Sequence, residues 1–425
     1  MRFVFLNPVA EFGGGEQSLI SWMKAVTEAF PQAEIVLIVP ALGPLADRAR
    51  AGGVRVEVLP IPDAIAELGD STARGGRLSA LAGLLSRVLI ALPAAWKYAF
   101  QFRAILAKMA PDIIHSNGIK SHLALWLAST GRGRSGSDGP PIFWHIHDFI
   151  GQRPLVAKAL GIMAWGVRAA VAVSEAVASD ARAVAPQLPI RVIHNVVDLN
   201  RFSPGPVDGN WLDQQAGFPP AIPGTIRVVL VATYARWKGQ DVFLKAAAKV
   251  LQQSQSFPIW FYIVGGPIYK TAGSQFSRDE LQSLATQLGV HASVGFVAYQ
   301  NRTNDVYRSA DIVVHASTLP EPFGLTIVES MACGRATIVS QAGGAAELFT
   351  DGHDAVGTRP GDVGSLASAI IRLAGDSPLR ERIGENARKS VEAKFNPQCL
   401  PEKVSKLYDP LWKSGLTDGT NRRTE

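Results

Sequence analysis

The sequence predicts an α/β protein with two doubly wound domains, each built on a parallel β-sheet with helices on both faces. Short apolar runs rich in Val and Ile alternate with longer helical patterns along almost the whole chain. Most of these runs are continuously apolar, which is typical of strands buried on both faces of a parallel sheet. A segment dense in Pro and Gly, residues 202–225, separates two such series and therefore indicates two domains.

The first series predicts a domain over residues 1–202. Its strand-like runs are RFVFLN, EIVLIVP, VRVEVLP, DIIHSN, PIFWHIHD, AAVAVSE and IRVIHN. Helical patterns lie between them, for example over residues 16–30 and 174–184. Ligands of such sheets bind beyond the carboxyl ends of the strands, so functional residues are expected in the loops that directly follow these runs.

A linker is expected over residues 203–225 and a second domain over residues 226–395. The strand-like runs of the second domain are RVVLVAT, WFYIVGG, SVGFVA, DIVVHAS and ATIVSQ. Residues 396–425 predict a C-terminal helix that packs back on the first domain, followed by a tail.

Composition indicates a globular protein. Of the 425 residues, 47% are hydrophobic and 18% are charged, a balance that excludes a disordered chain. The formal net charge of +6 is mild for this length and does not indicate a nucleic-acid partner. The two cysteines, Cys333 and Cys399, suggest neither a disulfide framework nor a metal cluster. The sequence has no HExxH motif and no Cys/His cluster, and we expect no metal and no cofactor.

The two cysteines and the lack of a recognisable targeting or membrane-spanning segment favour a cytoplasmic location. The N-terminal apolar stretch is too short for a signal peptide and has no small-residue cleavage site. The one candidate membrane span, residues 78–96, has Arg87 in its middle and Pro93 near its end, which argues against insertion.

A pair of carboxylates follows the run DIVVHAS. Glu321 and Glu329 are separated by seven residues, and a helix is expected from Gly324 to Gly334. Backbone N–H groups of residues 323–325 and the helix dipole would favour an anion. Glu329 lies among apolar residues and needs hydrogen-bond partners, such as the hydroxyls of a ribose. The alternative is a capping glutamate followed by an exposed one.

A basic loop follows the run RVVLVAT. Arg236 and Lys238 lie at the carboxyl end of a strand, where two cations can neutralise the charge on a departing diphosphate. The alternative is a solvated loop.

In the first domain, a glycine-rich loop follows the first predicted strand, and two other predicted strands end in histidine. Gly13, Gly14 and Gly15 let a ligand approach the backbone, although the G-x-G-x-x-G fingerprint of dinucleotide-binding domains is absent and a tight turn is the alternative. His115 ends one strand, and the run FWHIHD places His145 and His147 at the end of another. Histidines at such positions are more often structural than catalytic.

The text EPFGLTIVES, followed by MACGRATIVSQAGGAAEL, resembles the E-x7-E signature of family 4 retaining glycosyltransferases, which have the GT-B architecture of two Rossmann-like domains facing a cleft. The resemblance implies that Glu321 contacts the donor sugar and Glu329 the ribose. It also implies that the backbone amides of Phe323, Gly324 and Leu325 hold the sugar and the diphosphate.

Further segments carry the resemblance more loosely. Lys238 matches the lysine of the family's G-R-L-x-x-x-K-G motif, whereas Thr233 stands where the family has arginine. Arg236 is then the alternative second cation. Gly14 and Gly15 match a glycine loop that faces the donor phosphates, and His147 matches a strand-end histidine beside the donor sugar.

The resemblance implies a metal-independent hexosyltransferase that retains anomeric configuration. Its partners would be a nucleotide-sugar donor and a glycan or lipid-linked acceptor, in cell-surface polysaccharide or glycolipid biosynthesis. Three alternatives remain: an epimerase or phosphorylase of the same fold, a non-catalytic nucleotide-sugar-binding protein, and an NAD-dependent oxidoreductase, which the missing fingerprint disfavours.

Residues 74–111 predict either peripheral membrane contact or an ordinary pair of core-facing helices. The segment has no acidic residue, interleaves aromatic residues, and carries six basic ones: Arg74, Arg77, Arg87, Lys97, Arg103 and Lys108. Lys97, Gln101 and Lys108 share one face of a helix expected after Pro93. Basic amphipathic stretches of this kind can lie on anionic membranes. The resemblance to the family implies that the membrane surface would be the inner face of the cytoplasmic membrane.

Overall fold

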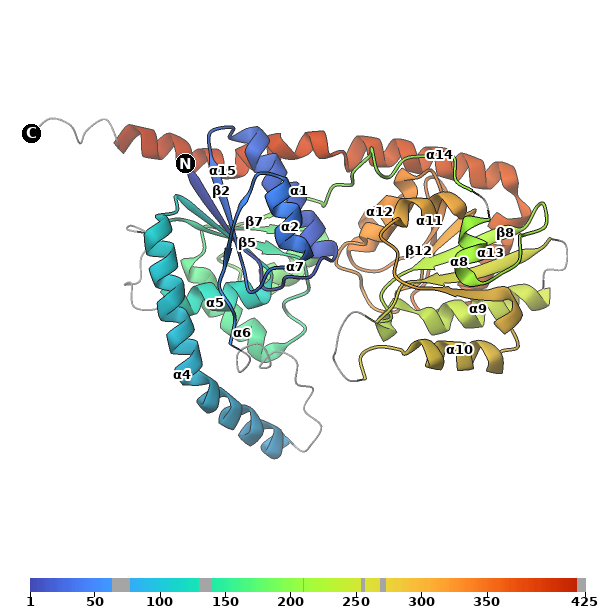
Figure 1. Ribbon diagram of the computed structural model, residues 1–425, viewed down its shortest axis with the longest axis horizontal. Helices are drawn as coiled ribbons and strands as arrows, with labels where there is room; N and C mark the ends of the chain where they lie inside the picture. The colour runs from blue at the N-terminus through green and yellow to red at the C-terminus, as the bar shows by residue number, and fades with distance from the viewer. Residues whose placement is uncertain (63–76, 130–138, 209, 254–256, 268–272, 419–425) are drawn as a thin grey trace, which may run out of the picture. The chain divides into compact units, whose positions relative to one another are not determined.

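The computed structural model describes residues 1–62, 77–129, 139–208, 210–253, 257–267 and 273–418 (Figure 1). The chain divides into two compact units. Unit 1 comprises Met1–His194 and Gln398–Glu425, and unit 2 comprises Asn195–Pro397.

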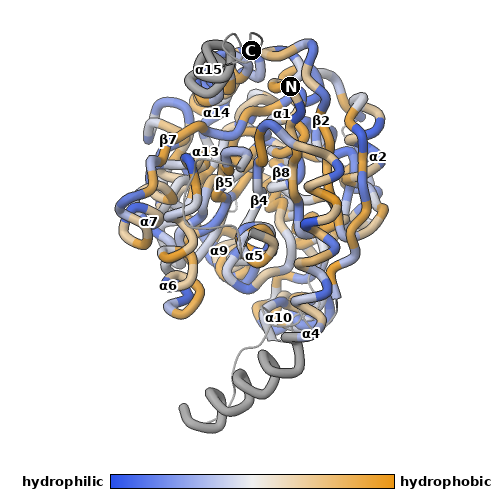
Figure 2. The backbone as a smooth tube through the Cα atoms, turned by 90° about the vertical axis from the view of Figure 1, so that its left-hand side faces the viewer, coloured by the Kyte–Doolittle hydropathy of each residue, from blue (hydrophilic) through white to orange (hydrophobic). Residues whose placement is uncertain are grey.

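Unit 1 is built on a seven-stranded sheet with the order β3-β2-β1-β4-β5-β6-β7. Every neighbouring pair is parallel, which confirms the predicted fold class. The strands are β1 (Arg2–Leu6), β2 (Glu34–Val39), β3 (Arg55–Val58), β4 (Ile113–Asn117), β5 (Ile142–Ile146), β6 (Ala169–Ala172) and β7 (Ile190–Val192). They coincide with the seven expected runs, and Figure 2 shows the hydrophobic character of strands such as β2.

Helices cover both faces of this sheet. They are α1 (Gly14–Ala29), α2 (Pro44–Ala51), α4 (Arg77–Met109), α5 (Ile119–Ser129), α6 (Pro154–Met163), α7 (Glu175–Val184) and α15 (Leu400–Asp418). On one face, Tyr98 and Phe102 of α4 pack with Val4 and Val36 of the sheet. On the other, Tyr408 of α15 packs edge-on against Phe3.

Helix α4 differs from the expectation. It is one helix of 33 residues that continues through Pro93, not a helix that begins after it. Proline removes one backbone hydrogen bond and introduces a local clash, which can kink a helix without ending it. Arg74 lies outside the described residues, as do the side chains of Arg77 and Arg87.

Unit 2 is built on a six-stranded parallel sheet with the order β10-β9-β8-β11-β12-β13. The strands are β8 (Ile226–Val231), β9 (Ile259–Val264), β10 (Val294–Val297), β11 (Ile312–His315), β12 (Ala336–Ser340) and β13 (Val356–Thr358). The first five are the expected runs. Strand β13 was not predicted, because its three residues are too few to show a pattern.

The helices of unit 2 are α8 (Trp211–Ala216), α9 (Gln240–Gln253), α10 (Arg278–Gln287), α11 (Thr303–Ser309), α12 (Leu325–Ala332), α13 (Val363–Gly375) and α14 (Ser377–Lys394). They alternate with the strands from α8 to β12, and α13 and α14 follow β13. Short 3₁₀ turns of unit 2 are η3 (Arg236–Lys238), η4 (His291–Ser293) and η5 (Gly344–Glu347). The turn η2 (Ala164–Gly166) lies in unit 1, and η6 (Pro397–Cys399) lies where the chain passes from unit 2 back to unit 1.

The segment expected as a linker, residues 203–225, lies in unit 2. Its helix α8 carries the buried Asp213, whose carboxylate accepts two hydrogen bonds from Arg227 of β8, at 2.9 and 2.7 Å. The Tyr262 hydroxyl of β9 donates a third at 2.5 Å. This buried ion pair is therefore fully hydrogen-bonded and anchors α8 to the sheet.

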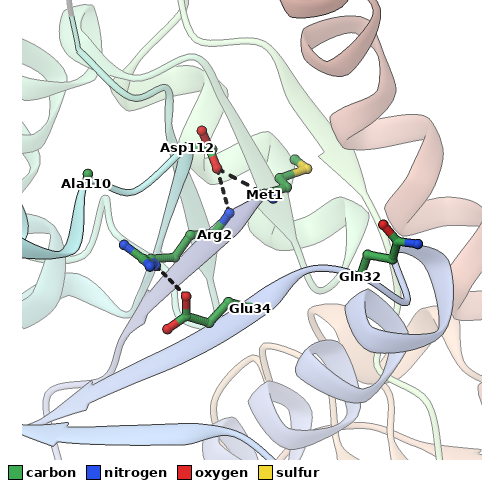
Figure 3. Close-up of a pocket in the computed structure, with 6 residues that line it drawn as sticks. All are labelled: Met1, Arg2, Gln32, Glu34, Ala110 and Asp112. Carbon is green, nitrogen blue, oxygen red and sulfur yellow. Dashed lines mark hydrogen bonds and ion pairs between the residues drawn. The ribbon is translucent and has the colours of Figure 1, made fainter.

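A polar pocket of about 380 Å³ opens at the amino ends of β1 and β2 (Figure 3). Arg2 crosses it, with its Nε 2.7 Å from Glu34 and its backbone N–H donating to Asp112. Ligands of doubly wound sheets bind at the opposite, carboxyl edge, so we assign this pocket no function.

Among the described residues, no helix combines the length and the apolar character that crossing a membrane requires.

Tyr408 ties α15 to α1 and β4 within unit 1. Its buried hydroxyl accepts a hydrogen bond from Trp22 Nε1 at 3.1 Å and lies 2.7 Å from His115 Nδ1. We predict that Tyr408→Phe lowers the free energy of unfolding by about 1–3 kcal/mol, because two buried polar groups lose their partner. Urea denaturation measures this, with Lys406→Ala on the exposed side of α15 as the control. Equal midpoints for wild type and Tyr408→Phe would contradict the prediction.

Candidate functional site

The carboxyl edge of the unit 2 sheet brings Lys238 and Glu321 together. In the strand order, the chain leaves β8 toward β9 and leaves β11 toward β12, so these two neighbours form the switch point at which ligands bind. Lys238 follows β8 and Glu321 follows β11. Lys238 Nζ lies 2.7 Å from Glu321 Oε2.

Glu321 is an ionised carboxylate in a buried position. Only 7% of the residue is exposed, and Oε2 also accepts from His315 Nε2 at 3.1 Å and from the Ser317 hydroxyl at 3.0 Å. Burial by itself would raise the pKa of Glu321. The Lys238 ammonium and the His315 hydrogen bond outweigh it and hold that pKa well below its usual range.

Two glycines allow the loops after β8 and β12 to approach the residues that follow β11. Gly239 has a φ of +77°, and a Cβ there would lie 1.9 Å from the Ala316 carbonyl oxygen. Gly343 has a φ of +66°, and a Cβ there would lie 2.6 Å from the Glu321 carbonyl oxygen. That carbonyl accepts from Gly344 N–H at 2.7 Å, which fixes the backbone of Glu321. Only glycine adopts these conformations without strain.

Helix α12 places the second glutamate. Gly324, with a φ of +107°, precedes the helix, and Leu325 begins it. Phe323 is buried just before this turn. Glu329 is buried within the helix and accepts a hydrogen bond from the Tyr307 hydroxyl at 3.1 Å. The first N–H groups of any α-helix have no acceptor within the helix, so this end of α12 is suited to an anion.

Arg236 and Lys238 have different partners. Both belong to η3, but Arg236 pairs with Glu280 of α10 at 2.7 Å and lies over the Phe276 ring. At Thr233, where the family motif has arginine, the backbone carbonyl accepts from the Gln240 side chain at 2.7 Å. Lys238 is thus the cation that lies at Glu321.

In unit 1, His147 lies at the corresponding switch point, between β1 and β4. It follows β5, and its Nε2 lies 2.6 Å from Asn117 Oδ1 at the end of β4. Gly14 and Gly15 begin α1 after β1. A Cβ at Gly15 would meet no heavy atom within 4 Å, so packing against the protein does not require glycine there.

The other two histidines of these strand ends are core residues. His115 and His145 are fully buried, and burial lowers the pKa of His115 to about 3. The His145 ring stacks on His147 with ring centres 4.1 Å apart. His145 therefore supports His147 by packing, and His115 packs in turn against His145 with ring centres 5.3 Å apart.

Sequence reasoning missed five contacting residues: His315, Ser317, Tyr307, Asn7 and Asn117. Four of them carried a signal, because His315 and Ser317 are two positions apart at one strand end and both asparagines directly end or follow apolar strands. Tyr307 gave none, since its contact with Glu329 spans 22 positions.

Within the described residues, no three His, Cys, Asp or Glu side chains are arranged to hold a metal ion.

Two family models match the chain. Residues 25–201 match "Glycosyltransferase Family 4" and residues 218–390 match "Glycosyl transferases group 1". The chain belongs to the family 4 glycosyltransferases.

Curated relatives agree with this family, and solved structures share the fold. The chain is 33% identical to a D-inositol 3-phosphate glycosyltransferase of Corynebacterium jeikeium over 237 residues, 53% of each protein. It thus spans about half the length of the curated relatives that it matches. Anabaena HepE, solved with UDP and glucose, aligns over 96% of this chain and 99% of its own with a TM-score of 0.75 and 23% identity.

Sucrose-phosphate synthase of Thermosynechococcus elongatus aligns over 97% of this chain and 99% of its own, with a TM-score of 0.73 and 18% identity. At these identities the likeness concerns the fold, which is GT-B.

The lowered pKa of Glu321 predicts how the stability of this family 4 glycosyltransferase depends on pH. A carboxyl whose pKa is lowered by folding stabilises the protein above its unfolded pKa, about 4.3, and loses this effect as the pH falls toward the folded pKa. Glu321→Gln should therefore be less stable than wild type at about pH 6, and the difference should narrow toward about pH 3.5. Urea midpoints measure it, with the exposed Glu392→Gln as the control. If the urea midpoints of wild type and Glu321→Gln differed by the same amount at both pH values, Glu321 would not be the ionised carboxylate described here.

Proposed function

We propose that this protein transfers a hexosyl group from a nucleotide sugar to a glycan or lipid-linked acceptor, with retention of configuration, in polysaccharide or glycolipid biosynthesis. The observation that carries the proposal is the buried ion pair between Lys238 and Glu321 at the switch point of unit 2. A cation and a carboxylate there can bind the diphosphate and the sugar hydroxyls of one donor.

Lys238 would act on the departing diphosphate. Its charge is balanced by Glu321 before the donor binds, and negative charge develops on the phosphate oxygens as the sugar leaves. A cation already held at that position stabilises the transition state without reorganisation. Arg236 is the candidate for a second cation, and it would have to leave Glu280 to serve.

Helix α12 would hold the rest of the donor. Glu329 would accept hydrogen bonds from the ribose hydroxyls, which are neutral donors that a buried carboxylate can use. The amides of Phe323, Gly324 and Leu325 would bind the diphosphate and the sugar. In unit 1, Gly14 and Gly15 would approach the phosphates, and His147 would contact the sugar.

Retention is proposed to follow front-face attack. The acceptor oxygen bonds to the anomeric carbon as the bond between that carbon and the phosphate oxygen breaks. The acceptor proton passes to the leaving phosphate oxygen, and the diphosphate departs on the face that the acceptor enters. The reaction needs no residue as base, and the protein supplies position and charge.

The comparisons support the donor class. HepE, which shares the fold, was solved with UDP and glucose. The relative from Corynebacterium jeikeium is named as a glycosyltransferase.

A panel of nucleotide sugars tests the reaction. The proposal expects one or more to be consumed with release of nucleoside diphosphate, and the product's anomeric configuration, measured by NMR, to match the donor's. A binding protein would shift its melting temperature without consuming any donor. An epimerase would change the sugar without needing an acceptor. Either outcome would overturn the proposal.

Glu329→Ala should weaken binding of the nucleoside diphosphate by about 1–3 kcal/mol, because ribose hydroxyls lose a buried acceptor. Isothermal titration calorimetry measures the affinity. Glu381→Ala, an exposed glutamate of α14, is the matched control. Unchanged affinity in a folded Glu329→Ala protein would remove this role.

Lys238→Ala should lower kcat by about two to three orders of magnitude, as loss of one transition-state charge stabiliser does. Steady-state donor consumption measures it. Arg236→Ala is the comparison, since it removes a neighbouring cation with another partner. Near-normal turnover of Lys238→Ala together with an inactive Arg236→Ala would transfer the role to Arg236.

We further propose peripheral contact of α4 with the cytoplasmic membrane. Trp96 and Phe100 are 67% and 74% exposed, on the same side of the helix as the exposed Lys97. Tyr98 and Phe102 of the same helix are buried against the sheet. The helix contains no acidic residue, so an aromatic surface with positive charge faces outward, and this combination suits an anionic bilayer.

The protein should co-sediment with vesicles that contain anionic lipid at low salt and be released at high salt. Replacing both Trp96 and Phe100 with Ser should abolish co-sedimentation, whereas Tyr299→Ser, an exposed aromatic of unit 2, should not. Recovery of the wild type in the supernatant under all conditions would contradict the contact and favour a soluble acceptor.

A further inference from the structure

A chain of hydrogen bonds connects the glycine loop of unit 1 to His147. Asn7 Nδ2 lies 2.9 Å from the Val9 carbonyl oxygen and 3.3 Å from Glu16 Oε1. Asn7 Oδ1 lies 2.6 Å from Asn117 Nδ2, and Asn117 Oδ1 lies 2.6 Å from His147 Nε2. We call Asn7 and Asn117 the asparagine relay.

The direction of this chain follows from its first member. A backbone carbonyl only accepts hydrogen bonds, so the Asn7 atom that faces Val9 must be the NH₂ group. The Asn7 oxygen therefore faces Asn117, which must present its own NH₂ group in return. The Asn117 oxygen then faces His147, and only a protonated Nε2 can donate to it.

Burial makes this direction hard to reverse. Both asparagines are buried, so water is not available to replace a lost partner. Turning either amide over would set two oxygens, or two NH₂ groups, against each other. Glu16 strengthens the same direction, because its other oxygen accepts from the Gly13 N–H at 3.1 Å and so holds the carboxylate beside Asn7.

The His147 ring carries one proton at neutral pH. Burial lowers the pKa of His147 to about 4, so the ring is neutral and has one N–H and one bare nitrogen. With the proton on Nε2, the bare nitrogen is Nδ1. Within the described structure, Nδ1 has no hydrogen-bond partner.

We propose that Asn7 and Asn117 are positioning residues that hold His147 as the Nε2–H tautomer, so that Nδ1 accepts a hydrogen bond from a hydroxyl of the donor sugar. The part that concerns the sugar rests on the proposed function, whereas the tautomer does not. The relay thus gives the ring one chemical role, that of an acceptor.

Nitrogen-15 NMR of histidine-labelled protein tests the tautomer without any substrate. The His147 signals are identified by their loss in His147→Gln. The wild type should show a protonated Nε2 and an unprotonated Nδ1 at neutral pH. A protonated Nδ1 in the wild type would overturn the proposal by itself, even if every relay variant failed to fold.

Variants then test the relay. Asn117→Leu removes the acceptor at Nε2 and should give a mixture of tautomers, as should Asn7→Leu, which frees the Asn117 amide to turn. Thr27→Val, which removes a hydroxyl bonded within α1, is the control and should leave the wild-type pattern. A pure Nε2–H pattern in both relay variants would overturn the proposal.

Kinetics test the link to the sugar. Asn117→Leu should lower kcat about tenfold, the rate equivalent of one hydrogen bond, and should have no further effect in a His147→Ala background. An equal loss in both backgrounds would overturn the positioning role. If the wild type turns over no nucleotide sugar, the proposed function fails, and the NMR result still decides the tautomer.

Discussion

The ion pair between Lys238 and Glu321 is the interaction around which unit 2 is organised. It requires the loops after β8 and β11 to meet, and they meet because Gly239 has no side chain where a Cβ would strike the Ala316 carbonyl oxygen. Gly343, in the loop after β12, likewise lets its backbone approach the Glu321 carbonyl oxygen. His315 and Ser317 then bind the same carboxylate oxygen. A buried charge with so many partners is held in one geometry, which is what a site that stabilises charge during a reaction needs.

In unit 1, neutral groups rather than charged ones hold one another in place at the switch point of the sheet. Its switch point lies between β1 and β4, and the polar residues Asn7, Asn117 and His147 meet there at the carboxyl ends of three strands. Hydrogen bonds and the stacking of His145 on His147 fix their orientation, without an ion pair among the three. One sheet thus presents a charged pair and the other a neutral ring of defined tautomer.

The sequence predicted the strands well because a continuous apolar run is a local signal. It also named Glu321, Glu329 and Lys238 as candidate site residues, because a family resemblance lies in consecutive residues, and the structure pairs Lys238 with Glu321. The partners of these side chains are distant in the chain, so no local pattern contained Tyr307 or joined Asn7 to Asn117. The prediction that a helix begins after Pro93 was wrong for a related reason. Whether a proline ends a helix depends on its surroundings, and α4 continues through Pro93.

The central claim is that Lys238 and Glu321 act as one unit on a nucleotide sugar. A double-mutant cycle on donor consumption, with Lys238→Ala, Glu321→Gln and the double variant, measures this most directly. The account predicts that the double variant is hardly slower than the slower single variant, because residues that act as a unit are not additive. Losses that simply multiply would contradict the account, as would turnover that neither substitution changes.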